Sequence, residues 1–134
     1  MTEDDANDGT DEDERIFSYS RAQAIEDKVL VDVSEMALKA GIRVPTAVTH
    51  EVWARYVALS EAARRAGQDE DGRLWDVLWM FACAASKQPK ADELHFKLYV
   101  STDRVEPRLI ELKAIIGPGD FGEPVLTIMI PDED

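Results

Sequence analysis

The sequence is short of the residues that build metal and disulfide sites. Its 134 residues include one cysteine, Cys83, and two histidines, His50 and His95. One cysteine cannot form an internal disulfide bond, and these three side chains do not make up a zinc site. Cys83 lies between alanines in the most apolar stretch, where a thiol usually fills the core without reacting. We therefore expect no metal, no cofactor and a reducing, cytoplasmic setting.

Long apolar runs and a targeting leader are also missing. The chain has no run of eighteen apolar residues, and no basic segment followed by an apolar one comes after Met1. A membrane-spanning helix needs about 20 apolar residues, and a secretory leader begins with basic and then apolar residues. The sequence thus predicts a soluble protein that has no membrane partner.

Positive charge is scarce, with 28 acidic against 15 basic residues and a net charge of -13. Residues 1–14 hold eight acids and no base, whereas residues 15–131 are close to balanced. Nucleic acids are bound by basic surfaces, so we expect no direct binding to DNA or RNA. Because residues 1–14 also have no large apolar side chain, they are predicted to be a disordered acidic tail. Residues 15–134 suit one domain.

What the chain does have is an apolar stretch from Gly72 to Ser86. From Leu74 to Ala85 the only polar residue is Asp76. A helix without a polar face of ordinary width is normally buried on most sides. We expect this helix, capped by Asp71, to be the centre of the fold. Three large aromatic residues are expected to pack in the core around it: Trp53, Trp75 and Trp79.

Shorter elements are predicted on both sides of this helix. N-cap residues and glycine stops indicate two short helices and a longer one before it: Ser20 to Asp27, residues 35–40 after Ser34, and Thr49 to Gly67. Residues 28–33 are predicted to be extended. After Pro89 the apolar period changes from 3.6 to 2, which predicts three strands: 94–101, 109–116 and 125–130. The fold class is α+β, with a C-terminal antiparallel β-meander laid over the buried helix.

Residues 117–122 match the pattern G-x-G-x-x-G letter for letter, with Gly117, Gly119 and Gly122 as its glycines and Asp120 at a variable position. A dinucleotide-binding loop needs a helix after its glycines, so that the helix N-terminus receives the pyrophosphate. Here Pro124 and a β-rich run follow, and Asp120 would repel phosphate. We interpret the segment as a tight hairpin turn. A ligand-binding turn is the alternative.

Two acidic turns and one N-terminal segment are the candidate surfaces for binding a protein partner. The acidic residues are usually solvated when they lie in such turns, but they could also form a charged patch. Tyr19 and Arg21 belong to a segment that either caps the core or recognises a partner. The candidate partner-binding residues are Asp69, Glu70, Asp71, Asp92, Glu93, Tyr19 and Arg21. The two histidines are expected on the surface, His50 in the first turn of a helix and His95 on the exposed face of a strand.

Three segments resemble a family of uncharacterised small proteins encoded on bacterial plasmids and other mobile elements. They begin at Ile16-Phe-Ser-Tyr-Ser-Arg, at Gln68-Asp-Glu-Asp-Gly-Arg and at Leu112-Lys-Ala-Ile-Ile-Gly. The resemblance covers nearly all of residues 16–134. It implies no catalytic residue and no cofactor.

Three functional hypotheses remain open. The first is a non-enzymatic accessory protein of a mobile element, which binds a basic protein of the host and antagonises its nucleic-acid binding or its role in defence. The second is a small-ligand or nucleotide-binding domain, with or without enzymatic activity, that uses the glycine turn. The third is a structural subunit that forms a homodimer through an exposed sheet face.

Overall fold

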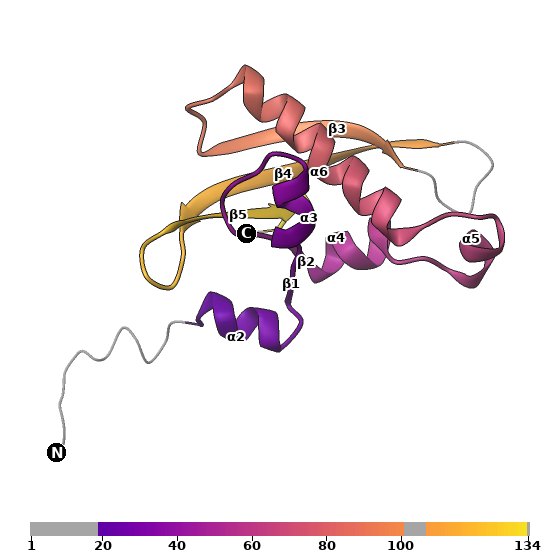
Figure 1. Ribbon diagram of the computed structural model, residues 1–134, viewed down its shortest axis with the longest axis horizontal. Helices are drawn as coiled ribbons and strands as arrows, with labels where there is room; N and C mark the ends of the chain where they lie inside the picture. Colours follow the sequence, from indigo (N-terminus) through magenta and orange to yellow (C-terminus); the bar gives the residue numbers. More distant parts are fainter. Residues whose placement is uncertain (1–18, 101–106, 134) are drawn as a thin grey trace, which may run out of the picture.

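Five strands form one mixed sheet in a computed structural model of the chain, which describes residues 19–100 and 107–133 (Figure 1). The order across the sheet is β1-β2-β5-β4-β3. All neighbouring strands are antiparallel except β2 and β5, which are parallel. The strands are β1 (Leu30–Asp32), β2 (Thr46–Thr49), β3 (Glu93–Val100), β4 (Arg108–Pro118) and β5 (Pro124–Met129).

The α+β class is confirmed, but the sheet is more than a C-terminal meander. Strands β3, β4 and β5 do form consecutive antiparallel pairs. Two N-terminal strands extend this sheet, and β2 lies parallel to β5 with Ala47 opposite Thr127. The middle position of β5 explains its sequence, since a strand with neighbours on both sides and cover on both faces is apolar throughout.

The described residues form six helical segments around the sheet, and the predicted helix from Thr49 to Gly67 is divided among three of them. Thr49 caps the first, as predicted, by accepting a hydrogen bond from Val52 N at 3.3 Å. The chain becomes extended at Ala58, and Ser60 starts a new helix. The segments are α2 (Arg21–Glu26), α3 (Ser34–Lys39), α4 (His50–Val52), the π-helical turn η1 (Trp53–Val57), α5 (Glu61–Arg65) and α6 (Glu70–Lys87).

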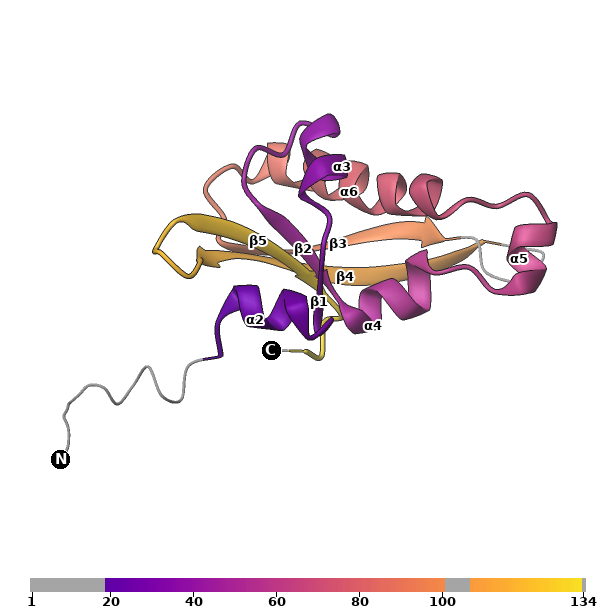
Figure 2. The ribbon, with the colours of Figure 1, turned by 60° about the horizontal axis from the view of Figure 1, so that its bottom comes forward.

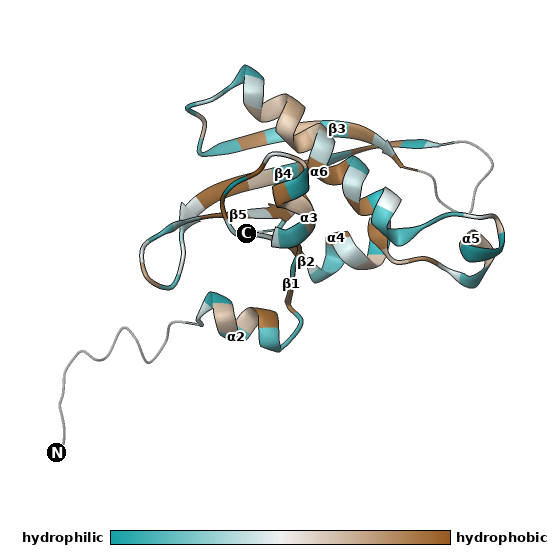
Figure 3. Cartoon of the chain, in the orientation of Figure 1, coloured by the Kyte–Doolittle hydropathy of each residue, from teal (hydrophilic) through white to brown (hydrophobic). Residues whose placement is uncertain are grey.

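The long helix α6 packs on one face of the sheet through a single stripe of side chains. The buried residues recur at helical spacing: Leu74, Val77, Leu78 and Phe81. Phe81 meets Phe96 of β3 edge to face, with ring centroids 5.9 Å apart. Such a contact adds about 0.5–1.5 kcal/mol to the gain from burial. Figure 3 shows apolar residues concentrated in the strands and in the middle of α6.

The prediction that this helix is buried on most sides is wrong. Trp79 is 48% exposed and Met80 37% exposed. Within the described chain α6 packs mainly against β3, α3 and η1, and the side that points away from them faces solvent. Trp53 and Trp75 are partly buried against the core, as expected, whereas Trp79 is not. The helix cap also differs from the expectation, because Asp69 rather than Asp71 accepts the capping hydrogen bond.

The two faces of the sheet are covered unequally. Helices α3 and α6 lie over one face, and α2 and α4 lie against the other (Figure 2). On β3 the side chains alternate between exposed and buried along the whole strand, as its sequence pattern predicts. The predicted acidic tail at 1–14 lies outside the described residues, as do residues 101–106 between β3 and β4.

Candidate functional site

The N-terminal segment and the glycine turn, which the sequence marks separately, lie together in the structure. The carboxylate of Asp120 accepts hydrogen bonds from Arg21 N at 2.7 Å and from Ala22 N at 3.0 Å. These bonds from Ala22 and Arg21 hold the pKa of Asp120 below its ordinary value. A carboxylate is favoured there because the first N–H groups of a helix have no partner within the helix.

The side chain of Arg21 fixes α2 on the central strand. Its Nη1 donates to Thr127 Oγ1 at 2.7 Å and its Nη2 donates to Leu126 O at 2.8 Å. Burial lowers the pKa of the Arg21 guanidinium, and the nearby carboxylates of Asp32 and Asp120 oppose this shift. With these donors committed to β5, Arg21 acts as a clamp on the sheet.

Tyr19, the other residue singled out in this segment, stays at the surface. Its hydroxyl donates to Asp27 Oδ2 at 2.5 Å, which raises the pKa of the phenol. This hydrogen bond links Tyr19, just before the N-terminus of α2, to Asp27 at the C-terminus of the helix. Arg21 is in a position that suits a cap on the core, whereas the Tyr19 side chain is 55% exposed.

The glycine turn is a tight hairpin between β4 and β5, as predicted. Its N–H groups donate to groups of the turn itself: Gly119 N to Glu123 O at 2.6 Å, Phe121 N to Glu123 Oε1 at 2.9 Å, and Gly122 N to Gly119 O at 3.1 Å. Gly122 has a φ of +84°, where a residue with a side chain is strained. A phosphate bound here would have to displace Glu123 and lie beside Asp120, which counts against the ligand-binding alternative.

The two acidic turns lie at opposite ends of α6 and do not form one patch. Asp69 caps the helix, and Glu70 accepts a hydrogen bond from Leu59 N at 3.3 Å and lies 3.8 Å from Arg64. Asp92 and Glu93 follow the other end. An 18-residue helix is about 27 Å long, so the two turns could contact a single partner only across the length of α6.

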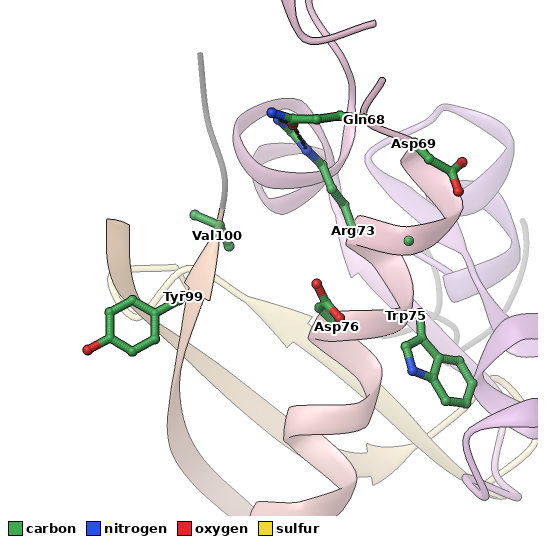
Figure 4. Close-up of a pocket in the computed structure, with 8 residues that line it drawn as sticks. Gln68, Asp69, Arg73, Trp75, Asp76, Tyr99 and Val100 are labelled. Atoms are coloured by element: carbon green, nitrogen blue, oxygen red, sulfur yellow. Dashed lines mark hydrogen bonds between the residues drawn. The ribbon is translucent and has the colours of Figure 1, made fainter. Parts of the chain in front are cut away.

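A cavity of about 380 Å³ lies beside the first acidic turn, between α6 and the end of β3 (Figure 4). Arg73 on its wall is held by Gln68, to which its Nε donates at 3.1 Å, and by Ala58 O at 3.3 Å. Figure 4 shows Asp76 on the side of α6 toward β3 and Trp75 on the other side. Arg73 thus joins the start of α6 to the preceding loop.

The most exposed apolar group on α6 is one that the sequence pattern assigned to the core. Trp75 and Trp79 stack with ring centroids 5.7 Å apart and an interplanar angle of 14°. Trp75 is anchored against the core and supports the exposed ring of Trp79. Cys83, one turn further along, is half-buried. The four-residue spacing of the two indoles was the available signal, but it fits core packing equally well.

His95 has two carboxylates beside it that spacing in the sequence could not reveal. Its Nδ1 lies 2.7 Å from Glu111 Oε2, and its Nε2 lies 3.5 Å from Glu93 Oε2. The register of β3 on β4 brings Glu111 close, since Glu111 is opposite Lys97 and diagonal to His95. On the same open face Tyr99 is 68% exposed and Leu109, directly opposite, is 50% exposed. His95 is exposed on its strand and His50 on the first turn of α4, as predicted.

Within residues 19–100 and 107–133, no group of three or more histidine, cysteine or acidic side chains is arranged to hold a metal ion. In the same part of the chain, no helix combines the length and the apolar character needed to cross a membrane.

Comparison with known proteins gives a family and no function. The model of a family of unknown function, DUF6573, matches residues 7–134. No curated protein and no solved structure matches the chain.

Proposed function

Because the chain belongs to the DUF6573 family, whose function is unknown, we propose from its geometry that it acts by binding another protein, without catalysis, through the outer side of α6. The observation that carries this proposal is the stacked pair of Trp75 and Trp79, with nearly half of the Trp79 side chain exposed. Tryptophan is enriched among the residues that dominate binding energy at protein interfaces. Since Trp75 already holds the ring of Trp79 in place, binding would cost little side-chain entropy.

The charges around the indole pair indicate the chemistry of the partner. Asp71 precedes Trp75 by four residues, so its carboxylate is a neighbour of the indoles on the helix surface, whereas Asp76 lies on the side of α6 toward β3. A partner that places apolar groups on Trp79 and lysine or arginine around them would complement this surface. Guanidinium and ammonium groups also interact favourably with the face of an indole.

We further propose that the partner is a basic, nucleic-acid-binding protein of the host, and that the chain is a cytoplasmic accessory protein of a mobile element. The net charge of -13 supports the first part, because it favours encounter with a basic surface. The resemblance of the segments after Ile16, Gln68 and Leu112 to proteins of mobile elements supports the second part. In this role the chain would compete with DNA or RNA for its partner.

The test begins with affinity purification from bacterial lysate at low and high salt, using the full chain as bait. A captured protein is purified and titrated against the wild type, Trp79→Ala and the matched control Leu38→Ala. Leu38 is an exposed apolar residue on α3. Loss of a dominant interface residue costs about 2 kcal/mol or more, which is roughly a 30-fold rise in Kd. We expect that rise for Trp79→Ala alone, together with displacement of the chain by added DNA.

Two results would contradict this proposal. If both variants bind the captured protein as tightly as the wild type, the indole pair is not the interface. If DNA does not compete and salt has no effect, the partner is not held through a nucleic-acid-binding surface.

A further inference from the structure

Strand β3 is an outer strand of the sheet, and the polar groups of its free edge can be identified. Among the described residues, only β4 pairs with β3. Ile116 N donates to Asp92 O at 2.7 Å, just before the first register pair, Glu93 with Ile115. In an antiparallel pair, residues that exchange hydrogen bonds alternate with residues that do not. The even-numbered residues of β3 therefore bond to β4, and the odd-numbered ones direct N–H and C=O groups outward: Glu93, His95, Lys97 and Tyr99.

This edge carries Lys97, a residue type that often blocks pairing, but it lacks the bulge, the proline and the short length that also prevent pairing with another strand. Its register on β4 runs without a bulge from Glu93 to Val100, and the strand contains no proline. The opposite edge, β1, has only three residues. A long, regular edge with unpaired backbone groups is a template for a further strand.

We propose that β3 pairs antiparallel with β3 of a second copy, so that two five-stranded sheets join into one of ten strands. The two-fold axis would stand perpendicular to the sheet. Both copies of α6 then lie on the same face, because each is packed on its own β3 through Phe81 and Phe96. The outward N–H and C=O groups of the two β3 strands would exchange hydrogen bonds across the axis.

Charge complementarity favours β3 of a second copy as the partner of β3. A register centred on His95 places Glu93 directly opposite Lys97 of the second copy, twice by symmetry. A register centred on Phe96 places the same two residues on a diagonal, which is still within reach of long side chains. A register centred on Lys97 would place the two lysines opposite each other, which is unfavourable.

This inference goes beyond the proposed function and uses a different surface. The pairing leaves the indole pair of Trp75 and Trp79 on the outer side of each α6. A dimer would present two such surfaces, so a partner with two binding sites would be held by avidity. The dimer and the binding of another protein can therefore fail or succeed independently.

Amide hydrogen exchange of the full chain, measured by NMR on concentrated and dilute samples, tests the pairing directly. In the dilute sample we expect slow exchange at Leu94, Phe96 and Leu98 and fast exchange at His95 and Lys97. In the concentrated sample His95 and Lys97 should become slow as well. If the alternation stays the same while sedimentation shows a dimer, the copies associate through another surface and the proposal is wrong. A monomer at every concentration also overturns it.

A pair of substitutions at one position tests the same edge. Proline is tolerated on an edge strand where its missing N–H faces solvent. Lys97→Pro therefore removes an outward donor without removing a bond to β4, and Lys97→Ala is its matched control. We expect the dimer dissociation constant to rise at least tenfold more for proline than for alanine, as measured by sedimentation. Equal effects of the two would contradict the pairing.

A charge exchange keeps the proposal testable if the proline variant does not fold. Lys97→Glu should weaken the dimer because it faces Glu93 of the second copy. The double variant Glu93→Lys with Lys97→Glu should restore the dimer. Failure of the double variant to recover any affinity, with its fold verified by circular dichroism, would count against β3 as its own partner.

Discussion

The carboxylate of Asp120 joins residues about a hundred positions apart, because it accepts hydrogen bonds from the backbone of Arg21 and Ala22. Its pKa is lowered from the ordinary value of 3.8 by these two bonds. A lowered pKa in the folded state means that the charged form stabilises the fold. This stabilisation is fully present above about pH 4 and is lost as the pH falls through the lowered pKa.

Asp120→Asn should therefore be less stable than the wild type at neutral pH. As the pH falls below 3.8 and Asp120 becomes protonated, the difference should shrink. Urea unfolding at pH 7 and at successively lower pH values measures it. The control is Asp132→Asn, which changes an exposed carboxylate near the C-terminal end of the described chain. A difference that stays constant with pH would show that the charge of Asp120 plays no part.

Two glycines of the β4–β5 hairpin, Gly122 in its turn and Gly117 at the end of β4, should respond differently to alanine. Gly122 has a φ of +84°, whereas Gly117 has an ordinary φ and open space where a Cβ would be placed. The left-handed conformation costs a residue with a side chain about 1–2 kcal/mol. Gly122→Ala should lower the free energy of unfolding by that amount, and Gly117→Ala should not. Equal losses for the two would mean that the turn is not held as described.

At the scale of elements, α6 is the helix whose two sides have different roles. Leu78 is fully buried, and Met80 is on the exposed side. Leu78→Ala should lower the free energy of unfolding by about 2–5 kcal/mol, because it leaves a cavity against the sheet. Met80→Ala should cost about 1 kcal/mol or less. Chemical denaturation measures both, and similar losses would indicate that the outer side of α6 is covered as well.

The features that could not be predicted from the sequence are also clearest at the scale of helices and strands. The 3.6 and 2 periods predicted α6 and the three C-terminal strands, since one buried face suffices to produce them. The pattern does not tell how many layers cover a helix, so the exposure of Trp79 was missed. Strand β2 was missed as a central partner of β5 because four residues are too few to show a period.

For a related reason, only part of the candidate site could be predicted from the sequence. Arg21 and the glycine turn were each recognised from local chemistry. Their contact depends on the packing of α2 against the hairpin of β4 and β5, which no spacing in the chain encodes. The same holds for His95 and Glu111, which the register of two strands brings together.

At the scale of the whole molecule, the acidic residues at 1–14 are expected to affect association with a partner without affecting the stability of the fold. Removing residues 1–14 deletes eight acidic residues, so that 20 acids and 15 bases remain. We expect the free energy of unfolding to change by less than about 0.5 kcal/mol. The rate of association with a basic partner should fall, and its dependence on salt should weaken, because long-range attraction is reduced. Stopped-flow binding and urea unfolding of the two chains measure these effects, and a large loss of stability would assign residues 1–14 to the fold.

The parallel pairing of β2 with β5 has a consequence for folding during synthesis on the ribosome. A nascent chain that ends before residue 124 has made β1, β2, β3 and β4, yet the strand that joins the two halves is still missing. Such contacts between distant parts of a chain slow folding and leave apolar strands uncovered for longer. During translation, the apolar side chains of β2 and β4 therefore stay uncovered until β5 has been synthesised. A chaperone would be needed most in this interval.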